Sequence, residues 1–249
     1  NHIKVAPLKS VLVRIKESSI GYRLAKGVFW TTAGAIISRG LMFIALIAVA
    51  RFLGKVGYGE LGIIRSTVGM FGVIAGFGLG LTATKHVAEF RQKSPARAGS
   101  IILLSNITAI ITGGGMALCL FFLSPWLADN SINAPHLIYE LRVSSLVLFL
   151  SAVTGNQTGS LAGFESFKAI AYINCFVGLV SFPCLIGGAY FGGLIGVVYA
   201  LFINLAIQWV LNFWALRREV KRHNISLDIC NCWSELPVLW NFSFPAVLA

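Results

Sequence analysis

Six long apolar segments divide the sequence and limit the possible fold more than any other feature. Each holds about 20 mostly apolar residues, the length that an α-helix needs to cross the hydrocarbon core of a bilayer. A spanning segment must be a helix or part of a closed barrel, and these continuous runs do not alternate as barrel strands do. The predicted spans are residues 28–50, 61–83, 100–123, 141–161, 169–191 and 194–216. We therefore predict an all-α membrane protein, with a lobe of six transmembrane helices followed by the start of a seventh.

The composition agrees with this prediction and argues against other classes. Hydrophobic residues make up 57% of the 249, charged residues only 12%, and the mean hydropathy is +0.80. An ordinary soluble domain has about 25% charged residues, so a soluble globule and a disordered chain are poor interpretations. The net charge of +11 lies mostly between the apolar segments, and we therefore expect no nucleic-acid partner.

The distribution of Lys and Arg predicts the orientation in the membrane. If each apolar segment crosses once, fifteen of the 20 basic residues fall on one side, in residues 1–27, 84–99, 162–168 and 217–235. The loops on the other side hold only Arg51, Lys55 and Arg142. Cytoplasmic loops collect Lys and Arg, so we predict a multi-pass protein with a cytoplasmic N-terminus.

Four regions follow from this topology. Residues 1–27 form a basic cytoplasmic segment, either an amphipathic helix on anionic headgroups or a solvated tail. Residues 28–216 form the six-helix lobe, and residues 217–235 form a basic cytoplasmic connector. Residues 236–249 begin a seventh helix that the sequence does not complete.

Two arginines inside predicted spans are the leading candidates for substrate binding. Arg39 lies near the middle of the first span, where an ionised guanidinium costs at least about 2.5–3.5 kcal/mol. Arg65 lies about one turn inside the second span, near its outer end, and from there it can also reach the interface. No Asp or Glu lies deep within the six spans. Because guanidinium groups suit phosphate oxygens, we predict an anionic ligand; a structural pair with another helix is the alternative for Arg39.

A stripe of amides on the sixth span is the second candidate feature. Asn204, Gln208 and Asn212 are spaced four residues apart and therefore share one helix face. They either line a hydrated path for sugars or form hydrogen bonds between helices. Glycines at 72, 76 and 80, and at 188, 192 and 196, predict close approach of helix backbones.

The sequence shows no signature of an enzyme. His86 and Glu89 share a helix turn but have no third metal ligand nearby in the sequence. The five cysteines have neither metal-ligand nor disulfide-framework spacing, and no phosphate-binding loop or catalytic triad is apparent. We predict a non-enzymatic protein without a cofactor or a metal site.

Residues 27–89 resemble the opening of a polysaccharide-biosynthesis flippase. The resemblance rests on GVFW at 27–30, SRG at 38–40, ARFLGKVGYGEL at 50–61, GFGLG at 76–80 and TKHVAE at 84–89, with GFE at 163–165 and WNFSFP at 240–245. These motifs are similar to those of O-antigen (Wzx-type) exporters in the multidrug/oligosaccharidyl-lipid/polysaccharide exporter superfamily, over the N-terminal half of such proteins.

The resemblance implies half of a two-lobe, MATE-like transporter in a bacterial or archaeal cytoplasmic membrane. Its implied function is to move undecaprenyl-pyrophosphate-linked oligosaccharide across that membrane by alternating access, with membrane lipids around it. In related lipid flippases, arginines on the first two helices line a cationic cavity, and Arg39 and Arg65 occupy those helices here. The sequence ends where a second lobe would begin, so we expect either a missing C-terminal lobe or a second copy as partner.

Three alternatives remain at this point. A multidrug or cation antiporter of the same fold would need buried carboxylates, and the six spans contain none. An integral-membrane enzyme acting on lipid-linked glycan would need large outer loops rich in His, Asp or Glu, whereas residues 124–140 hold only Asp129, His136 and Glu140. A non-transporting assembly subunit would fit only a chain that is natively this short.

Overall fold

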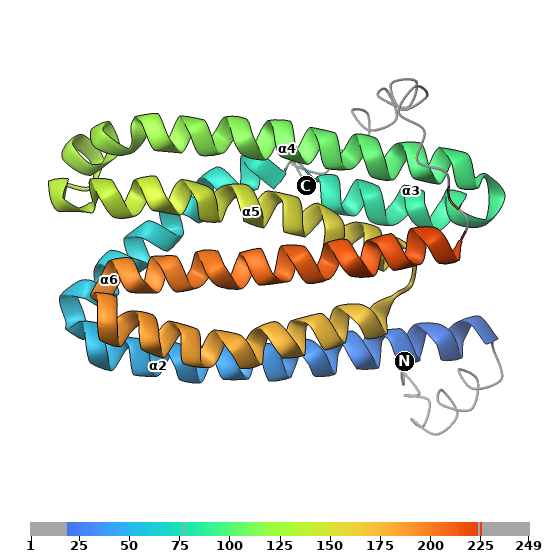
Figure 1. The fold of residues 1–249 in the computed structure, drawn as a ribbon, viewed down its shortest axis with the longest axis horizontal. Coiled ribbons are helices and arrows are strands. Elements are labelled where there is room, and N and C mark those ends of the chain that lie inside the picture. The colour runs from blue at the N-terminus through green and yellow to red at the C-terminus, as the bar shows by residue number, and fades with distance from the viewer. Residues whose placement is uncertain (1–18, 77, 224, 226–249) are drawn as a thin grey trace, which may run out of the picture.

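The fold is a bundle of long helices. The structure, a computed structural model, describes residues 19–76, 78–223 and 225. Its elements are α2 (Ser19–Gly76), α3 (Leu79–Lys93), α4 (Pro95–Trp126), the π turn η1 (Leu127–Ser131), the 3₁₀ turn η2 (Pro135–Leu137), α5 (Ile138–Gly163) and α6 (Phe167–Arg222). Four helical stretches of the described chain are long and apolar enough to cross a membrane. They lie side by side along the length of the bundle (Figure 1), and the predicted all-α class is confirmed.

Two glycines divide the longest helices into pairs of membrane-length legs. Gly54 breaks α2 at a φ of 69°, and Gly193 breaks α6 at a φ of 57°. A residue with a Cβ is disfavoured at such angles, so glycine is suited to both positions. Figure 1 shows that α2 and α6 each double back at the same end of the bundle. With α4 and α5, the legs give six antiparallel segments, and their turns lie where the sequence predicts them.

The second predicted span differs from the structure because it is not continuous. Residues 61–83 were expected to form one helix, but α2 ends at Gly76 and α3 begins at Leu79. Between them Gly78 has a φ of 63°, which interrupts the helical backbone. The glycine cluster that resembles the flippase motif is therefore a break within a span as well as a packing surface.

Helix ends extend beyond the predicted spans. The sixth predicted span stops at residue 216, whereas α6 continues to Arg222 because Arg, Glu and Lys are good helix formers. Part of the predicted connector 217–235 is thus helical. The helix α2 likewise begins at Ser19, within the basic segment 1–27. Residues 1–18 and the predicted seventh helix, 236–249, lie outside the described residues.

Small residues set the contacts between helices. A Cβ built on Gly178 would lie 2.9 Å from the Cα of Ser38, which places the first legs of α2 and α6 in backbone contact. A Cβ on Gly159 in α5 would lie 2.7 Å from the Cα of Gly80 in α3. The Thr84 hydroxyl strengthens that crossing by donating to the Gly159 carbonyl at 2.9 Å. Within the bilayer the hydrophobic effect does not drive helices to associate, because lipid tails are as apolar as the side chains. Close van der Waals packing of this kind therefore holds the bundle together.

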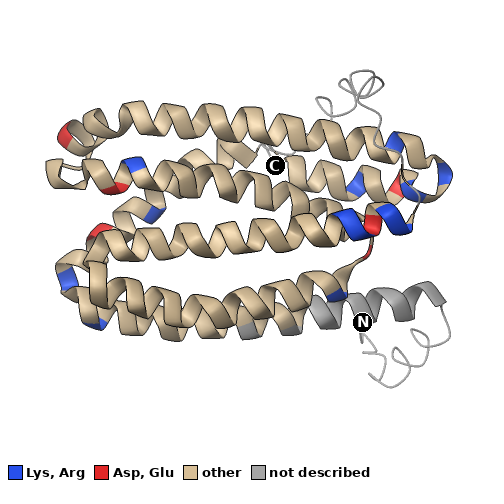
Figure 2. Ribbon diagram, in the orientation of Figure 1, with Lys and Arg blue, Asp and Glu red and all other residues tan. Residues whose placement is uncertain are grey.

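The surface is banded as a membrane protein requires. Figure 2 shows Lys, Arg, Asp and Glu gathered at the two ends of the bundle, with a nearly uncharged belt between them. Large apolar side chains are exposed on the outside, including Phe122 (74%), Phe191 (87%) and Trp214 (73%). The α3–α4 turn, the α5–α6 turn and the C-terminal end of α6 meet at one end (Figure 1). We call this end the basic end, because eight Lys and Arg residues gather in these three segments: Arg91, Lys93, Arg97, Lys168, Arg217, Arg218, Lys221 and Arg222.

Candidate substrate-binding groove

An open groove of about 540 Å³ lies between the second leg of α2, helix α5 and the second leg of α6. It is lined by Ile64, Arg65, Val68, Gly69, Gly72, Val73, Ser144, Val147, Ser151, Leu201 and Leu205. Gly69 and Gly72 leave gaps between the side chains of the α2 wall, and most of the remaining lining is aliphatic. The groove is therefore wide, apolar and built from three separate helices.

Arg65 is the single charged residue in this lining. Its side chain is exposed, and no carboxylate forms an ion pair with it among the described residues. The two serine hydroxyls of the groove are occupied, because Ser144 donates to the Glu140 carbonyl at 2.7 Å and Ser151 to the Leu148 carbonyl at 2.9 Å. The fixed positive charge is thus the main polar group that the groove offers to a ligand.

Arg39 lies elsewhere, on the first leg of α2. It is exposed and is not among the groove residues. Ile36 (66% exposed) and Phe43 (65% exposed) occupy the same helix face, three residues before and four residues after it. The structure does not bring Arg39 and Arg65 into one groove. Arg39 instead marks a helix face that the described part of this chain leaves uncovered.

The three amides of the predicted stripe differ in burial and in hydrogen bonding. Asn212 is buried and donates from Nδ2 to the Thr158 hydroxyl of α5 at 3.0 Å, which is a hydrogen bond between helices. Asn204 is also buried, but its Oδ1 has no hydrogen-bond partner. Gln208 is half-buried. None of the three lines the Arg65 groove, so the geometry at Asn212 favours helix packing, while Asn204 keeps an unused acceptor.

A comparison with known proteins assigns the family. A family model described as "Polysaccharide biosynthesis protein" matches residues 24–230, which is most of the chain and all six apolar segments. The chain belongs to this family. The resemblance expected from the motifs at 27–89 is therefore confirmed at the level of the polysaccharide biosynthesis and flippase proteins.

Two curated relatives extend this assignment. The chain is 25% identical over 199 residues to the lipid II flippase MurJ of Bacillus subtilis (strain 168), covering 74% of this chain and 37% of that protein. It is also 25% identical over 148 residues to stage V sporulation protein B of the same organism, covering 59% of this chain and 28% of that protein. The chain thus spans about a third of the length of these relatives.

One solved structure has the same fold. It is an outward-facing multidrug resistance MATE family transporter of the MOP superfamily, with a TM-score of 0.69 and 15% identity. The match covers 90% of this chain and 52% of that transporter. The bundle is therefore a multi-pass membrane lobe with a MATE-like fold, about half the length of that transporter.

Sequence reasoning missed a polar network in this member of the family. Asn156 on α5 donates to the Asn106 side-chain oxygen on α4 at 3.1 Å. With its amide oriented to satisfy both groups, Gln157 pairs with the indole and carbonyl of Trp209 at 3.2 Å. The sequence showed Asn156 and Gln157 only as polar interruptions of an apolar span. Polar residues in a span that face neighbouring helices are the signal that could have identified the network.

A buried ion pair at the basic end was missed as well. Arg91, at the end of α3, donates from Nη2 to Oε1 of Glu165 in the α5–α6 turn. The side chain of Arg91 is only 8% exposed. The GFE motif at 163–165 contained the acidic partner, but 74 residues separate the two and sequence alone does not pair them.

Proposed function

We propose that this chain is one lobe of a flippase that moves undecaprenyl-pyrophosphate-linked oligosaccharide across the cytoplasmic membrane for polysaccharide biosynthesis, including O-antigen. The main support is a lone cation, Arg65, in an open and otherwise apolar groove between three membrane helices. A phosphate group is the part of a lipid-linked glycan that needs such a charge. Membership of the polysaccharide biosynthesis family and the similarity to a lipid II flippase support a lipid-linked glycan as the substrate class.

In the proposed path, the two arginines bind the pyrophosphate one after the other, not at the same time. Arg39 holds the pyrophosphate first, on the first leg of α2, and Arg65 holds it nearer the outer exit. The glycan occupies the space between lobes, on the side of the half-buried Gln208, while the polyprenyl tail stays in lipid. Rocking of one lobe against the other then opens the site outward, as in other repeat-built transporters. The proposal requires no covalent chemistry, cofactor or metal.

The proposal needs a second lobe. Arg39, Ile36 and Phe43 lie on a face that nothing in the described chain covers, and a guanidinium at mid-span depth is costly in lipid. A second lobe packed there would replace lipid with a hydrated cavity. The solved MATE transporter is nearly twice the length matched here, which supports either a C-terminal lobe or a second copy of this chain as the partner.

The orientation belongs to the same proposal. The basic end collects the α3–α4 turn, the α5–α6 turn and the end of α6, and segments rich in Lys and Arg stay in the cytoplasm. We therefore place the basic end in the cytoplasm, together with the N-terminus. The turns at Gly54 and Gly193 then face outward.

A multidrug antiporter is the second candidate, because the solved structure of like fold is a multidrug transporter. Proton or sodium coupling needs carboxylates within the spans. In the described ranges the six acidic residues lie at the two ends of the bundle, as Figure 2 shows. Their position favours an anionic cargo over a cationic one.

Export of lipid-linked glycan in cells tests the proposal. Arg39→Ala should abolish the appearance of lipid-linked glycan at the outer leaflet, and Arg39→Lys should retain part of it. Arg142→Ala is the matched control, because Arg142 is also exposed but packs over the Phe121 ring at 5.3 Å. Export at the wild-type rate from Arg39→Ala, with normal protein levels, would refute the proposed role.

A further inference from the structure

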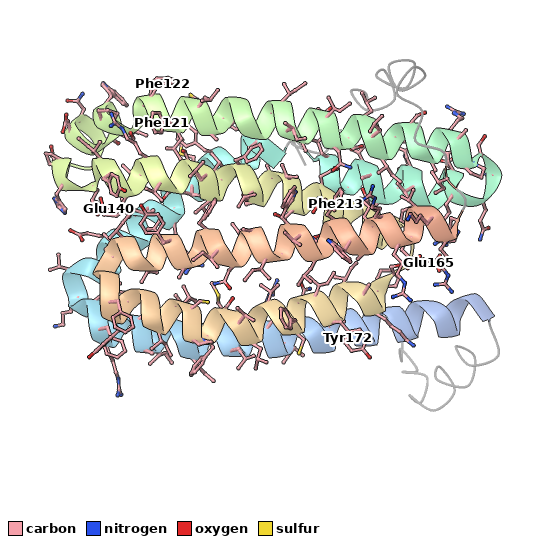
Figure 3. The ribbon with its side chains drawn as sticks, viewed as in Figure 1. Phe121, Phe122, Glu140, Glu165, Tyr172 and Phe213 are labelled. Carbon is pink, nitrogen blue, oxygen red and sulfur yellow. The ribbon has the colours of Figure 1, made fainter. Side chains whose placement is uncertain are left out.

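A second pocket, of about 630 Å³, lies at the basic end of the bundle, away from the Arg65 groove. It is formed where α3 ends, α6 begins and α6 ends. Its charged and titratable lining residues are Arg91, Glu165, Lys168, Arg218, Glu219, Arg222 and His223. Figure 3 labels Glu165 and Tyr172, two of the lining residues, beside this meeting point of the helices. Neither the proposed flippase path nor the family comparison uses this pocket.

The lining has more positive than negative charge, counted over the described residues. Four cations face two carboxylates. Glu165 is engaged by Arg91, and Glu219 lies 3.8 Å from the Nε2 of His223. Lys168, Arg218 and Arg222 are exposed and have no carboxylate within ion-pair distance in the described part of the chain. The pocket therefore presents three free cations from the two ends of one helix.

The start of α6 adds to this positive potential. The first turn of a helix has unpaired N–H groups and a partial positive charge, which an acidic residue or a capping side chain normally balances. Here Ser166 makes no side-chain cap, the first turn contains no acidic residue, and Lys168 lies within it. An anion in the pocket would satisfy the same groups.

The buried Arg91 supplies an independent indication of a ligand. Its Nη2 is used by Glu165, but its Nε has no hydrogen-bond partner although it is buried. A buried unpaired donor on a cation is costly and needs an explanation. Since Arg91 lines the pocket, a ligand oxygen there is a suitable acceptor for the Nε proton.

We propose that this pocket binds the phosphate group of an anionic lipid at the membrane surface. The pocket is lined by residues of the basic end, and Figure 2 shows charged residues gathered at this end of the bundle. In a membrane-spanning bundle, an end that carries the charges lies near the lipid headgroups. Basic pockets between membrane helices on the cytoplasmic side are suited to anionic headgroups. Tyr172, exposed at the rim one turn beyond Lys168, has the amphipathic ring typical of the membrane interface.

Lipid binding to the purified full chain in detergent tests the site by native mass spectrometry, with phosphatidylglycerol and phosphatidylcholine as probes. We expect phosphatidylglycerol to bind more tightly. The double variant Arg218→Gln/Arg222→Gln should weaken it roughly 25-fold, because each cation near an anionic group contributes about five-fold in affinity. These two side chains are exposed, so the variant should keep its fold, which circular dichroism checks.

The matched control removes the same charge from the same helix turns. Arg217→Gln/Lys221→Gln changes neighbours that do not line the pocket, and Arg217 instead lies over the Phe213 ring at 5.7 Å. This control should bind phosphatidylglycerol within about two-fold of wild type. Equal losses in both double variants, or no loss in either, would overturn the proposal.

Two further probes distinguish the source of the phosphate. Farnesyl pyrophosphate displacing phosphatidylglycerol would assign the site to pyrophosphate-linked lipid, and the reverse preference would assign it to bulk phospholipid. Inorganic pyrophosphate that binds as tightly as either lipid would overturn the lipid assignment. Transport plays no part in these measurements, so failure of the flippase proposal would leave their outcome unaffected.

Discussion

Arg91 on α3 and Glu165 in the α5–α6 turn form an ion pair across the basic end of the bundle. Glu165 has a φ of 58°, a left-handed conformation usually taken by glycine. Its N–H bonds the Ala162 carbonyl at 2.9 Å and the next N–H, of Ser166, bonds the Leu161 carbonyl at 3.1 Å, so Glu165 ends α5 in a Schellman motif. A position suited to glycine thus carries a carboxylate that neutralises a buried guanidinium.

This relationship predicts that two substitutions of Glu165 differ in stability. Glu165→Ala should lower stability by about 1–3 kcal/mol, because it leaves Arg91 buried and unpaired while keeping the backbone strain. Glu165→Gly loses the same ion pair but relieves about 1 kcal/mol of left-handed strain, so it should be the more stable of the two. Thermal unfolding in detergent compares them. Equal melting temperatures would show that the φ of 58° stores no strain.

The α3–α5 crossing predicts a strict requirement for glycine at one position. Gly159→Ala should destabilise the bundle by more than about 2 kcal/mol, because the new Cβ would overlap the Gly80 backbone, which cannot rotate away. Gly155→Ala, four residues earlier on α5, has nothing within 4 Å of the new Cβ. That control should be neutral or stabilising, since alanine favours a helix by about 1 kcal/mol over glycine. Similar unfolding temperatures for both variants would contradict the crossing.

Filling the Arg65 groove should block export without harming the fold. Val73 lines the groove and is 66% exposed, so Val73→Trp should occupy the space proposed for substrate. Ile74→Trp is the control, because Ile74 is 52% exposed but does not line the groove. We expect a loss of at least about ten-fold in glycan export for the first variant and near-normal export for the second. Equal activity in both would remove the groove from the path.

A double-mutant cycle tests whether the amide stripe packs helices together or lines a hydrated path. Asn212→Ala and Thr158→Ala should each lower stability, and their double-mutant cycle should show a coupling of about 0.6 kcal/mol if the 3.0 Å hydrogen bond packs the helices. Asn204→Ala should instead change stability little, because the buried Oδ1 of Asn204 has no hydrogen bond to lose. Additive effects of the first pair would argue against the packing role.

Much of the fold could be predicted because membrane length and apolar continuity are local properties. The six segments and the turns at Gly54 and Gly193 follow from runs of about 20 apolar residues separated by glycine and charge. The break at Gly78 was missed because it lies inside an apolar run, where no change in polarity marks it. Only the left-handed φ, a property of the folded backbone, reveals that interruption.

The candidate site was less predictable for a similar reason. The sequence identified Arg39 and Arg65 through the energetic penalty of charge in a span, but not that they occupy different surfaces. From the sequence, Arg91 was counted only as one of the basic residues of a cytoplasmic loop, because its partner Glu165 is 74 residues away. Pairings between distant helices depend on the rotation of each helix about its axis, which the pattern of apolar residues constrains only loosely.

The hairpin formed by the two legs of α6 bears on how the chain enters a membrane. Its legs approach closely enough that a Cβ on Gly188 would lie 2.8 Å from the carbonyl carbon of Gly196. Between Lys168 and Arg217 the sequence has no Asp, Glu, Lys or Arg, and the tip bends at Gly193 rather than through a polar loop. Both legs can therefore be delivered into the bilayer as a single pre-paired unit, with no charged side chain translocated. During insertion of this pair, the cationic residues at its base, Lys168 and Arg217, can stay at one membrane surface.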